Sequence, residues 1–258
     1  MNFTLLTIIG CSIIFFATTL GATIVFFIKK EFSKKLNSII SGFSAGIMIA
    51  ASVWGLIIPS MDYAHYMDEL YFLPTLIGII LGCFFLLVID LIIQKLKQVK
   101  ENSIISNQSL SRFLISFTIH NIPEGMAVGF AFGSALSSNS ETALLSALGL
   151  AIAIAVQNIP EGVAVAMPVF HATKSKKKGF VYGMLSGIVE PFSAIVGIIL
   201  ASQVGVLLPW VLAFSAGCMI FVTIDDLIPE SKQQSSSAGA WAFMTGFIIM
   251  MILDIILA

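Results

Sequence analysis

The chain contains long, continuous stretches of apolar residues, and these restrict its fold more than any other feature of the sequence. A helix needs about 20 mainly apolar residues to cross the hydrocarbon core of a bilayer. Eight such stretches are predicted, at residues 3–28, 38–60, 71–93, 113–136, 142–168, 179–201, 206–228 and 238–257. A spanning chain must form helices or a closed barrel, and barrel strands alternate apolar with polar residues, which these stretches do not. The sequence therefore predicts an all-α integral membrane protein with eight transmembrane helices.

The composition agrees with a protein that lies almost entirely in the membrane. Only 10% of the 258 residues are charged, and 58% are hydrophobic, whereas soluble domains have roughly 25% charged residues. A soluble enzyme and a nucleic-acid-binding protein are therefore excluded. Little of the chain lies outside the predicted spans, so residues 1–258 are expected to form a single transmembrane domain with the lipid bilayer as its surroundings.

The basic residues predict how the chain is oriented. All 13 Lys and Arg residues fall between spans 1 and 2, 3 and 4, 5 and 6, or 7 and 8. The positive-inside rule places these connections in the cytoplasm, with both termini outside it. The protein is thus predicted to be a multi-pass protein of the cell membrane. The charged residues of the opposite connections are all acidic. These connections are either ordinary solvated loops or a negative face that concentrates cations.

Three glutamates interrupt the apolar spans at a similar depth. Glu124, Glu161 and Glu190 each lie 12 or 13 residues from a flanking cytoplasmic cation, or about 18 Å at the 1.5 Å rise of a helix. A charge near the bilayer centre costs roughly 2.5–3.5 kcal/mol on insertion scales. Such carboxyl groups must be protonated or must share a cation. Three of them at one level favour a metal site over isolated protonated side chains.

Two nearly identical hexapeptides surround the first two glutamates. Residues 120–125 read His-Asn-Ile-Pro-Glu-Gly, and residues 157–162 read Gln-Asn-Ile-Pro-Glu-Gly. The first residue and the glutamate of each motif are four apart and share a helix face. The asparagine is three residues from the same glutamate, so each carboxylate can bridge two neighbouring cations. The prolines are expected to kink both helices, and interrupted helices are tolerated where they line a cavity.

The donor set predicts which cation binds. One imidazole, several carboxylates and amide oxygens, without a thiolate, suit a divalent first-row metal. Zinc is the favoured ion, with iron, manganese, cobalt and cadmium as alternatives. The metal would be the substrate, and no catalytic cofactor is expected.

These paired motifs, with the span count and the basic cytoplasmic connections, resemble the ZIP family of divalent-metal transporters. Gln157 at the head of the second motif looks like the GufA-type branch. The resemblance implies import of metal into the cytoplasm by an elevator-type carrier that forms a homodimer. It also implies two metal positions, the first formed by His120, Glu124, Gln157 and Glu161, and the second by Asn121, Glu124, Asn158, Glu161 and Glu190.

A weaker internal similarity links spans 2 and 7. Residues 44–49 read Ser-Ala-Gly-Ile-Met-Ile and residues 215–220 read Ser-Ala-Gly-Cys-Met-Ile, each followed by an Ile-Pro pair. The two spans run in opposite directions, which predicts an inverted repeat of spans 1–3 and 6–8 around spans 4 and 5. Inverted repeats are typical of transporters whose site lies at the repeat interface.

The repeat also predicts two acidic mouths. Asp62 follows Pro59 at the outer end. Met48 would contact the metal between this entrance and the site. A further group of acidic residues flanks Pro229 and would form the exit, namely Asp225, Asp226 and Glu230. The remaining candidates are interpreted as non-ligands in loops or near span ends, namely His65, Asp90, His171 and Asp254.

Two other classes of function fit the residues less well than a metal transporter. An intramembrane metal-dependent hydrolase is disfavoured because the sequence lacks a His-Glu-x-x-His helix and an evident general base. A proton-coupled carrier of an organic solute would use the glutamates as proton relays. The chain is accordingly predicted to be a transporter and not an enzyme.

Overall fold

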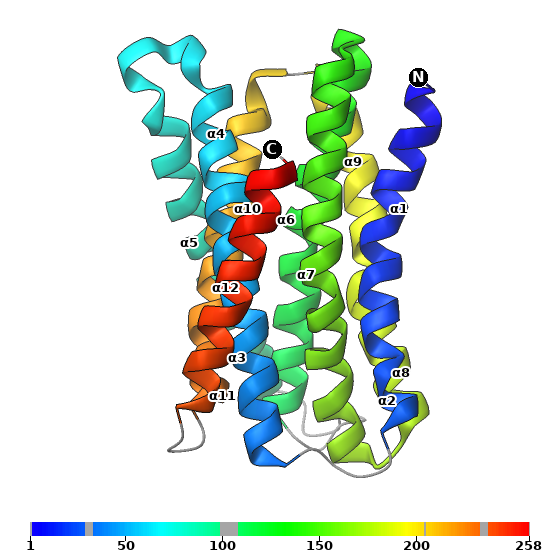
Figure 1. Cartoon of the computed structure of the whole chain (residues 1–258). Helices are drawn as coiled ribbons and strands as arrows, with labels where there is room; N and C mark the ends of the chain where they lie inside the picture. Colours follow the sequence, from blue (N-terminus) through cyan, green and yellow to red (C-terminus); the bar gives the residue numbers. More distant parts are fainter. Residues whose placement is uncertain (1, 29–32, 99–107, 204, 233–236, 258) are drawn as a thin grey trace.

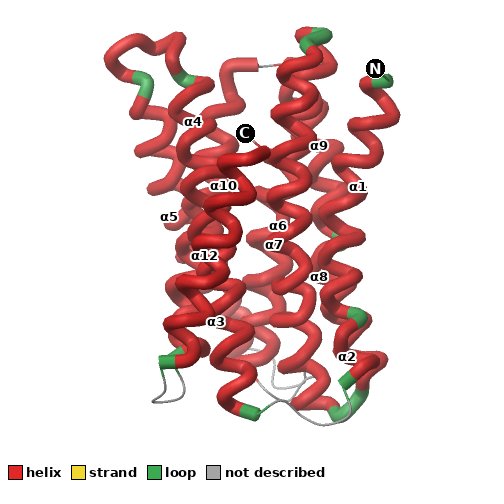
Figure 2. Tube along the Cα trace, in the orientation of Figure 1, coloured by secondary structure: helices red, strands yellow, loops and turns green. Residues whose placement is uncertain are grey.

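The computed structural model describes residues 2–28, 33–98, 108–203, 205–232 and 237–257, and these residues contain helices but no strand (Figure 2). The prediction of an all-α protein is confirmed. The longer helices are α1 (Phe3–Ala22), α3 (Lys34–Ala50), α5 (Phe72–Gln98), α6 (Gln108–Ser138), α7 (Glu141–Thr173), α8 (Lys176–Gly187), α9 (Val189–Gln203), α10 (Leu208–Val222) and α12 (Ala238–Leu257). Short elements join them, namely α2 (Ile24–Phe27), η1 (Ala51–Ile57), α4 (Ile58–Tyr63), η2 (His65–Leu70), η3 (Gly205–Leu207), η4 (Thr223–Leu227) and α11 (Ile228–Ser231).

Seven helical stretches of the described chain are long and apolar enough to cross a membrane. They are Phe3–Phe27, Lys34–Tyr63, Phe72–Ile92, Glu141–Thr173, Lys176–Ala201, Leu208–Ser231 and Ala238–Ile256. Each corresponds to one predicted span. The remaining predicted span, 113–136, lies within α6, which has 31 residues but is not among the seven.

The helices fall into two groups that we call the motif bundle and the frame bundle. The motif bundle consists of α1, α2, α6, α7, α8 and α9, and the frame bundle of α3, η1, α4, α5, α10, η4, α11 and α12 (Figure 1). Within the motif bundle α6 packs along α9 and α7 along α1, whereas in the frame bundle α3 packs along α12 and α10 along α5. The two bundles meet mainly where α10 crosses α6 and where α3 and α12 touch α7.

Glycines explain why the helices within each bundle approach so closely. A Cβ atom added at Gly46 of α3 would overlap the carbonyl oxygen of Phe243 in α12, and one at Gly217 would overlap that of Ile79 in α5. Small residues allow helix backbones to approach one another in membranes. Among the described glycines, every such close approach joins helices of the same bundle. Side chains with ordinary packing therefore form the surface between the bundles.

Two helices of the frame bundle contain a π-helical segment at matching places. After α3, the hydroxyl of Ser52 in η1 donates to the carbonyl of Met48 in α3 at 2.7 Å. After α10, the hydroxyl of Thr223, the first residue of η4, donates to the carbonyl of Met219 in α10, also at 2.7 Å. Each hydroxyl bonds four residues back, a pattern that often bends helices. In both cases an Ile-Pro pair starts the short helix that follows.

Both ends of the described chain lie toward one end of the bundle in Figure 1. The beginnings of α3 and α8 and the end of α11 lie at the other end. We call these the terminal end and the basic end, because lysines occur at or beside the three latter positions.

Candidate metal site

The three glutamates come together inside the motif bundle. Glu124 on α6 and Glu190 on α9 are 0% exposed, and Glu161 on α7 is 1% exposed. Glu190 lies within electrostatic reach of both other carboxyl groups. The three glutamates thus lie on neighbouring helices of one bundle, and their common depth in the membrane stays a prediction.

Amide side chains of the second motif donate hydrogen bonds to two of these carboxyl groups. Gln157 Nε2 lies 2.8 Å from Glu124 Oε1, and Asn158 Nδ2 lies 3.0 Å from Glu190 Oε1. The hydroxyl of Thr18 on α1 donates to the same oxygen of Glu190 at 3.1 Å. Among the described side chains, no three His, Cys, Asp or Glu residues form a ready metal-binding group. In this arrangement, amide nitrogens of Gln157 and Asn158 are hydrogen-bonded to the carboxyl groups of Glu124 and Glu190.

Several buried oxygens of the motif residues and of Glu190 have no hydrogen-bond donor in the described part of the chain. They are Asn121 Oδ1, Gln157 Oε1, Asn158 Oδ1 and Glu190 Oε2. All four side chains are at most 1% exposed. Buried polar atoms in proteins nearly always have a partner, and an oxygen without one is costly. Oxygens of this kind are the ligands that hard or borderline metal cations prefer.

The two motif helices continue through their prolines. Pro123 lies inside α6, and Pro160 and Pro168 lie inside α7, so neither helix is interrupted at its motif. The carbonyl of Pro123 accepts a hydrogen bond from Ser215 of α10 at 2.8 Å, which links the two bundles beside the site. His120 belongs to α6, but its side chain lies outside the described residues.

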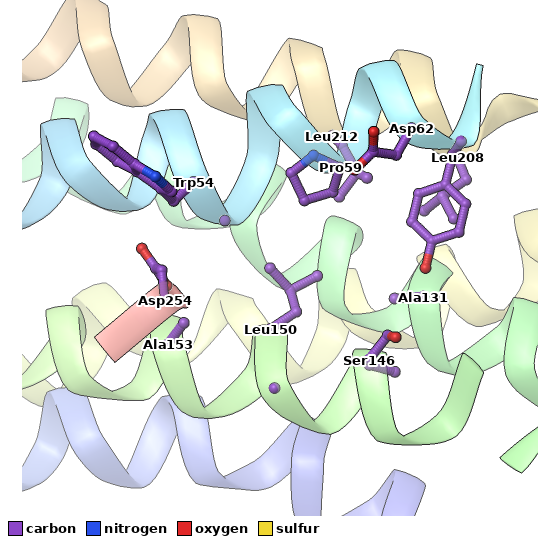
Figure 3. Close-up of a pocket in the computed structure, with 14 residues that line it drawn as sticks. Trp54, Pro59, Asp62, Ala131, Ser146, Leu150, Ala153, Leu208, Leu212 and Asp254 are labelled. Carbon is purple, nitrogen blue, oxygen red and sulfur yellow. The ribbon is translucent and has the colours of Figure 1, made fainter. Parts of the chain in front are cut away.

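A cavity of about 360 Å³ lies between the bundles toward the terminal end. Asp62 and Tyr63 of α4 line it on the frame side, and Ser146, Leu150 and Ala153 of α7 line it on the motif side (Figure 3). Ala153 stands one helical turn before Gln157, so the cavity leads along α7 toward the carboxylates. Asp62 therefore lines this cavity, and its role at an entrance stays a prediction.

Asp254 of α12 also lines this cavity, between Trp54 and Ala153 in Figure 3. It is 5% exposed, and its Oδ2 has no hydrogen-bond partner among the described residues. Asp254 lies near a span end, as the sequence indicates, but its side chain lines the cavity between the two bundles. The position of Asp254 in its span does not reveal whether neighbouring helices cover the face of the helix on which it lies.

The other predicted pathway residues do not gather in one place. Asp225 and Asp226 line a cavity of about 10 Å³ against α5, where Asp90 also lies. Glu230 lines a separate cavity of about 20 Å³ between α3 and α7 at the basic end. Met48 is fully buried, and its sulfur lies 3.8 Å from the hydroxyl of Thr223.

The fold and the site together define a class of protein, a multi-pass helical membrane protein with a buried cluster of carboxylates and amides from two matching motifs. A family model described as ZIP Zinc transporter matches residues 109–254, more than half of the chain. The chain belongs to this family, and the resemblance drawn from the motifs is confirmed.

Relatives align along nearly the whole chain. Zinc transporter ZIP11 of Xenopus tropicalis is 30% identical, with 96% of each chain covered. Zinc transporter ZupT of Chlorobaculum parvum is 32% identical, with 93% of each chain covered. Zinc transporter GufA of Myxococcus xanthus is 33% identical and covers 92% of this chain and 93% of its own, which agrees with the GufA-like motif. The prediction of a transporter rather than an enzyme is confirmed.

Proposed function

We propose that the protein carries divalent metal cations, zinc above all, across the cell membrane into the cytoplasm. The observation that carries the proposal is the buried cluster of three carboxylates with unsatisfied amide and carboxylate oxygens around them. The related proteins named zinc transporters support the choice of ion. The metal is the substrate, and no catalytic cofactor is part of the proposal.

The site would hold two ions bridged by Glu124 and Glu161. His120 and Gln157 would complete one position, and the second would use Asn121, Asn158 and Glu190. Binding requires Gln157 and Asn158 to turn their amide oxygens toward the cations, away from the hydrogen bonds that their nitrogens make now. Rotation of an amide exchanges a donor for an acceptor at little steric cost, since its two ends have nearly the same size.

The chain would cross the membrane eight times, with α6 as the additional span. Its 31 residues correspond to about 46 Å of helix, and it packs along the apolar helix α9. Spans 1–3 and 6–8 would form an inverted repeat. The matching π segments of α3 and α10 support this relation, as does the pairing of α3 with α12 and of α10 with α5.

Transport would proceed by movement of the motif bundle against the frame bundle, as the family resemblance implies. The close glycine contacts inside each bundle support rigid-body movement, because they do not have to break. Asp62 and Asp254 would guide cations into the large cavity. Glu230, with Asp225 and Asp226, would form the exit through which cations leave at the basic end after the bundles have moved. The basic end would face the cytoplasm, with both termini outside it, and residues 1–258 would form one unit of a homodimer.

Zinc uptake into liposomes tests the proposal directly. The purified protein is reconstituted around a zinc-sensitive dye, and the wild type is compared with Glu161→Ala and with Glu69→Ala, which alters an exposed carboxylate. We expect uptake by the wild type and by Glu69→Ala, and a loss of about 100-fold or more for Glu161→Ala. Wild-type liposomes that accumulate no zinc above empty liposomes would refute metal transport. Organic-solute uptake without zinc uptake would favour the proton-coupled carrier, and zinc-dependent hydrolysis would favour the enzyme.

A further inference from the structure

The two motif helices have matching contacts with two other helices of the motif bundle. Gly162 follows Glu161 on α7, and a Cβ atom added there would overlap the carbonyl oxygen of Thr18 on α1. Gly125 follows Glu124 on α6, and a Cβ atom there would overlap the carbonyl oxygen of Glu190 on α9. The point where α1 crosses α7 thus matches the point where α9 crosses α6.

The asparagines of the motifs provide a second, independent match. Asn158 Nδ2 donates to the carbonyl of Ile14 at 3.2 Å, and Asn121 Nδ2 donates to the carbonyl of Ser186 at 3.0 Å. Ile14 stands four residues before Thr18, and Ser186 stands four residues before Glu190. Ser186 lies in the last turn of α8 and Glu190 in the first turn of α9, and the two helices form one apolar stretch, Lys176–Ala201. Both comparisons therefore assign Thr18 to the place in α1 that Glu190 occupies in this stretch.

These two equivalent side chains touch each other. Both are 0% exposed, and the hydroxyl oxygen of Thr18 lies 3.1 Å from Glu190 Oε1. The same hydroxyl lies 3.2 Å from the carbonyl of Ile14, the usual local partner of a threonine in a helix. Gly187 leaves room for Thr18, because a Cβ atom added there would lie 2.8 Å from the Cβ of the threonine. The packing thus confines the hydroxyl to the neighbourhood of Glu190.

The two oxygens of Glu190 have unequal surroundings as a result. Oε1 accepts from Thr18 and from Asn158, whereas Oε2 has no hydrogen-bond partner in the described part of the chain. When Asn158 turns its amide oxygen toward a cation, the hydroxyl of Thr18 is the donor that still holds Oε1. The carboxylate then presents Oε2 in a fixed direction.

We propose that Thr18 is a positioning residue of the metal site, which orients Glu190 through Oε1 and occupies the place where the matching contacts would otherwise put a fourth acidic side chain. The inference rests on the proposed metal transport. It adds α1 to the helices that shape the site. It also explains why the described site contains three carboxylates although its helices are matched in pairs.

The test compares three substitutions on α1. Thr18→Val removes the hydroxyl and keeps the shape, and Thr18→Ser keeps the hydroxyl. Thr7→Val is the matched control, because Thr7 is also buried on α1 and donates to the carbonyl four residues before it, at Phe3. Zinc binding to purified protein is measured by calorimetry, and the KM and maximal rate of uptake are measured in liposomes.

We expect Thr18→Val to weaken zinc binding by at least about tenfold, in the range found for groups that orient metal ligands. Thr18→Ser and Thr7→Val should stay within about twofold of the wild type. In a Glu190→Ala background Thr18→Val should have no further effect, since coupled residues are not additive. Unchanged binding by Thr18→Val, or equal loss in Thr18→Ser, would overturn the inference while wild-type transport stands.

Thr18→Ala is a second variant that distinguishes loss of the hydroxyl from a folding defect of Thr18→Val. It also lacks the hydroxyl and introduces no larger group, so it should reproduce the loss seen with Thr18→Val. If Thr18→Val does not fold, normal zinc binding by Thr18→Ala would refute the positioning role. Absence of zinc binding in the wild type would instead refute the proposed function itself.

Discussion

The helices α6 and α7 carry almost the same six residues but use them differently. Asn121 of α6 donates to the backbone of α8, whereas Asn158 of α7 donates to the carboxylate of Glu190 as well as to backbone. Among the residues that the structure describes, the large cavity touches five of α7 and only Ala131 of α6. The comparison teaches that one motif can be placed twice and still face different surroundings, because the two helices run in opposite directions.

Of the two motif helices, α7 forms more of the wall of the cavity at the terminal end. Residues before its motif line the cavity, from Ser146 to Ala153. The residues before the motif of α6 lie toward the basic end instead. If the motif bundle moves, the matching part of α6 would line the cavity that opens at the other end.

The largest effect is expected where the two helices are most alike. Glu124→Ala and Glu161→Ala should each lower zinc uptake by about 100-fold or more, because each removes a charged ligand, whereas outer groups alone cost about 10–100-fold. Calorimetry should find the double variant no worse than the single ones. A variant of one glutamate that retains more than about a tenth of wild-type uptake would break the equivalence of the motifs.

Stability gives the next contrast. Gly125→Ala and Gly162→Ala should lower the melting temperature in detergent by similar amounts, about 3–10 °C, since overpacking costs roughly 1–3 kcal/mol. Gly55→Ala is the control, because a Cβ atom there would meet only Asp254 Oδ1, at 3.8 Å. A large effect at one motif glycine and none at the other would show that the two helix crossings differ.

The asparagines should separate the two motifs. Asn158→Ala should weaken zinc binding by about tenfold, in the range for partners that orient metal ligands, because it removes a contact with Glu190 as well as an amide oxygen. Asn121→Ala should have a smaller effect, since its nitrogen holds only backbone. Calorimetric titration checks the order, and equal losses would mean that the hydrogen bond to Glu190 is unimportant.

Gln157→His makes the second motif identical to the first. An imidazole nitrogen binds zinc more strongly than an amide oxygen, so zinc should bind about fivefold tighter and turnover should slow. The variant also removes the hydrogen bond from Gln157 to Glu124. Single-turnover and steady-state uptake distinguish tighter binding from slower release, and faster turnover at unchanged affinity would contradict the expectation.

The smallest effect is expected in the cavity beside α7. Asp254→Asn should raise the KM for zinc about threefold and leave the maximal rate nearly unchanged, because a carboxylate there only raises the local cation concentration. Asp62→Asn should act in the same direction and less strongly, since its side chain is 68% exposed. An equal change at low and saturating zinc would exclude an entrance role for either residue.

The sequence predicted much of this arrangement because a membrane leaves few solutions. The length of each apolar stretch indicated a helix, and seven predicted spans have a counterpart. Glu124, Glu161 and Glu190 could be found because charge is rare at that depth, and repetition of a hexapeptide drew attention to the asparagines beside them.

Other features of the site and of the cavity could not be predicted from the sequence. Thr18 is one hydroxyl residue among several in an apolar helix, and only its contact with Glu190 distinguishes it. Asp254 stands near a span end, where acidic residues usually reach water, yet neighbouring helices cover it. The sequence also cannot show that Gln157 and Asn158 turn their nitrogens toward the carboxylates, since an amide offers either end to its neighbours.

The amides of Gln157 and Asn158 have a consequence for the return half of a working cycle. After releasing the metal, a carrier must return to the conformation that binds the next ion. Unpaired carboxylates would raise the free energy of this return step, because charge inside a bilayer is costly. The nitrogens of Gln157 and Asn158 donate hydrogen bonds to Glu124 and Glu190 and so replace part of the coordination that a cation would supply, although a neutral amide does not cancel the charge of a carboxylate. In the proposed transport cycle, these hydrogen bonds would ease the return of the empty site and would favour net delivery of metal over exchange of one ion for another.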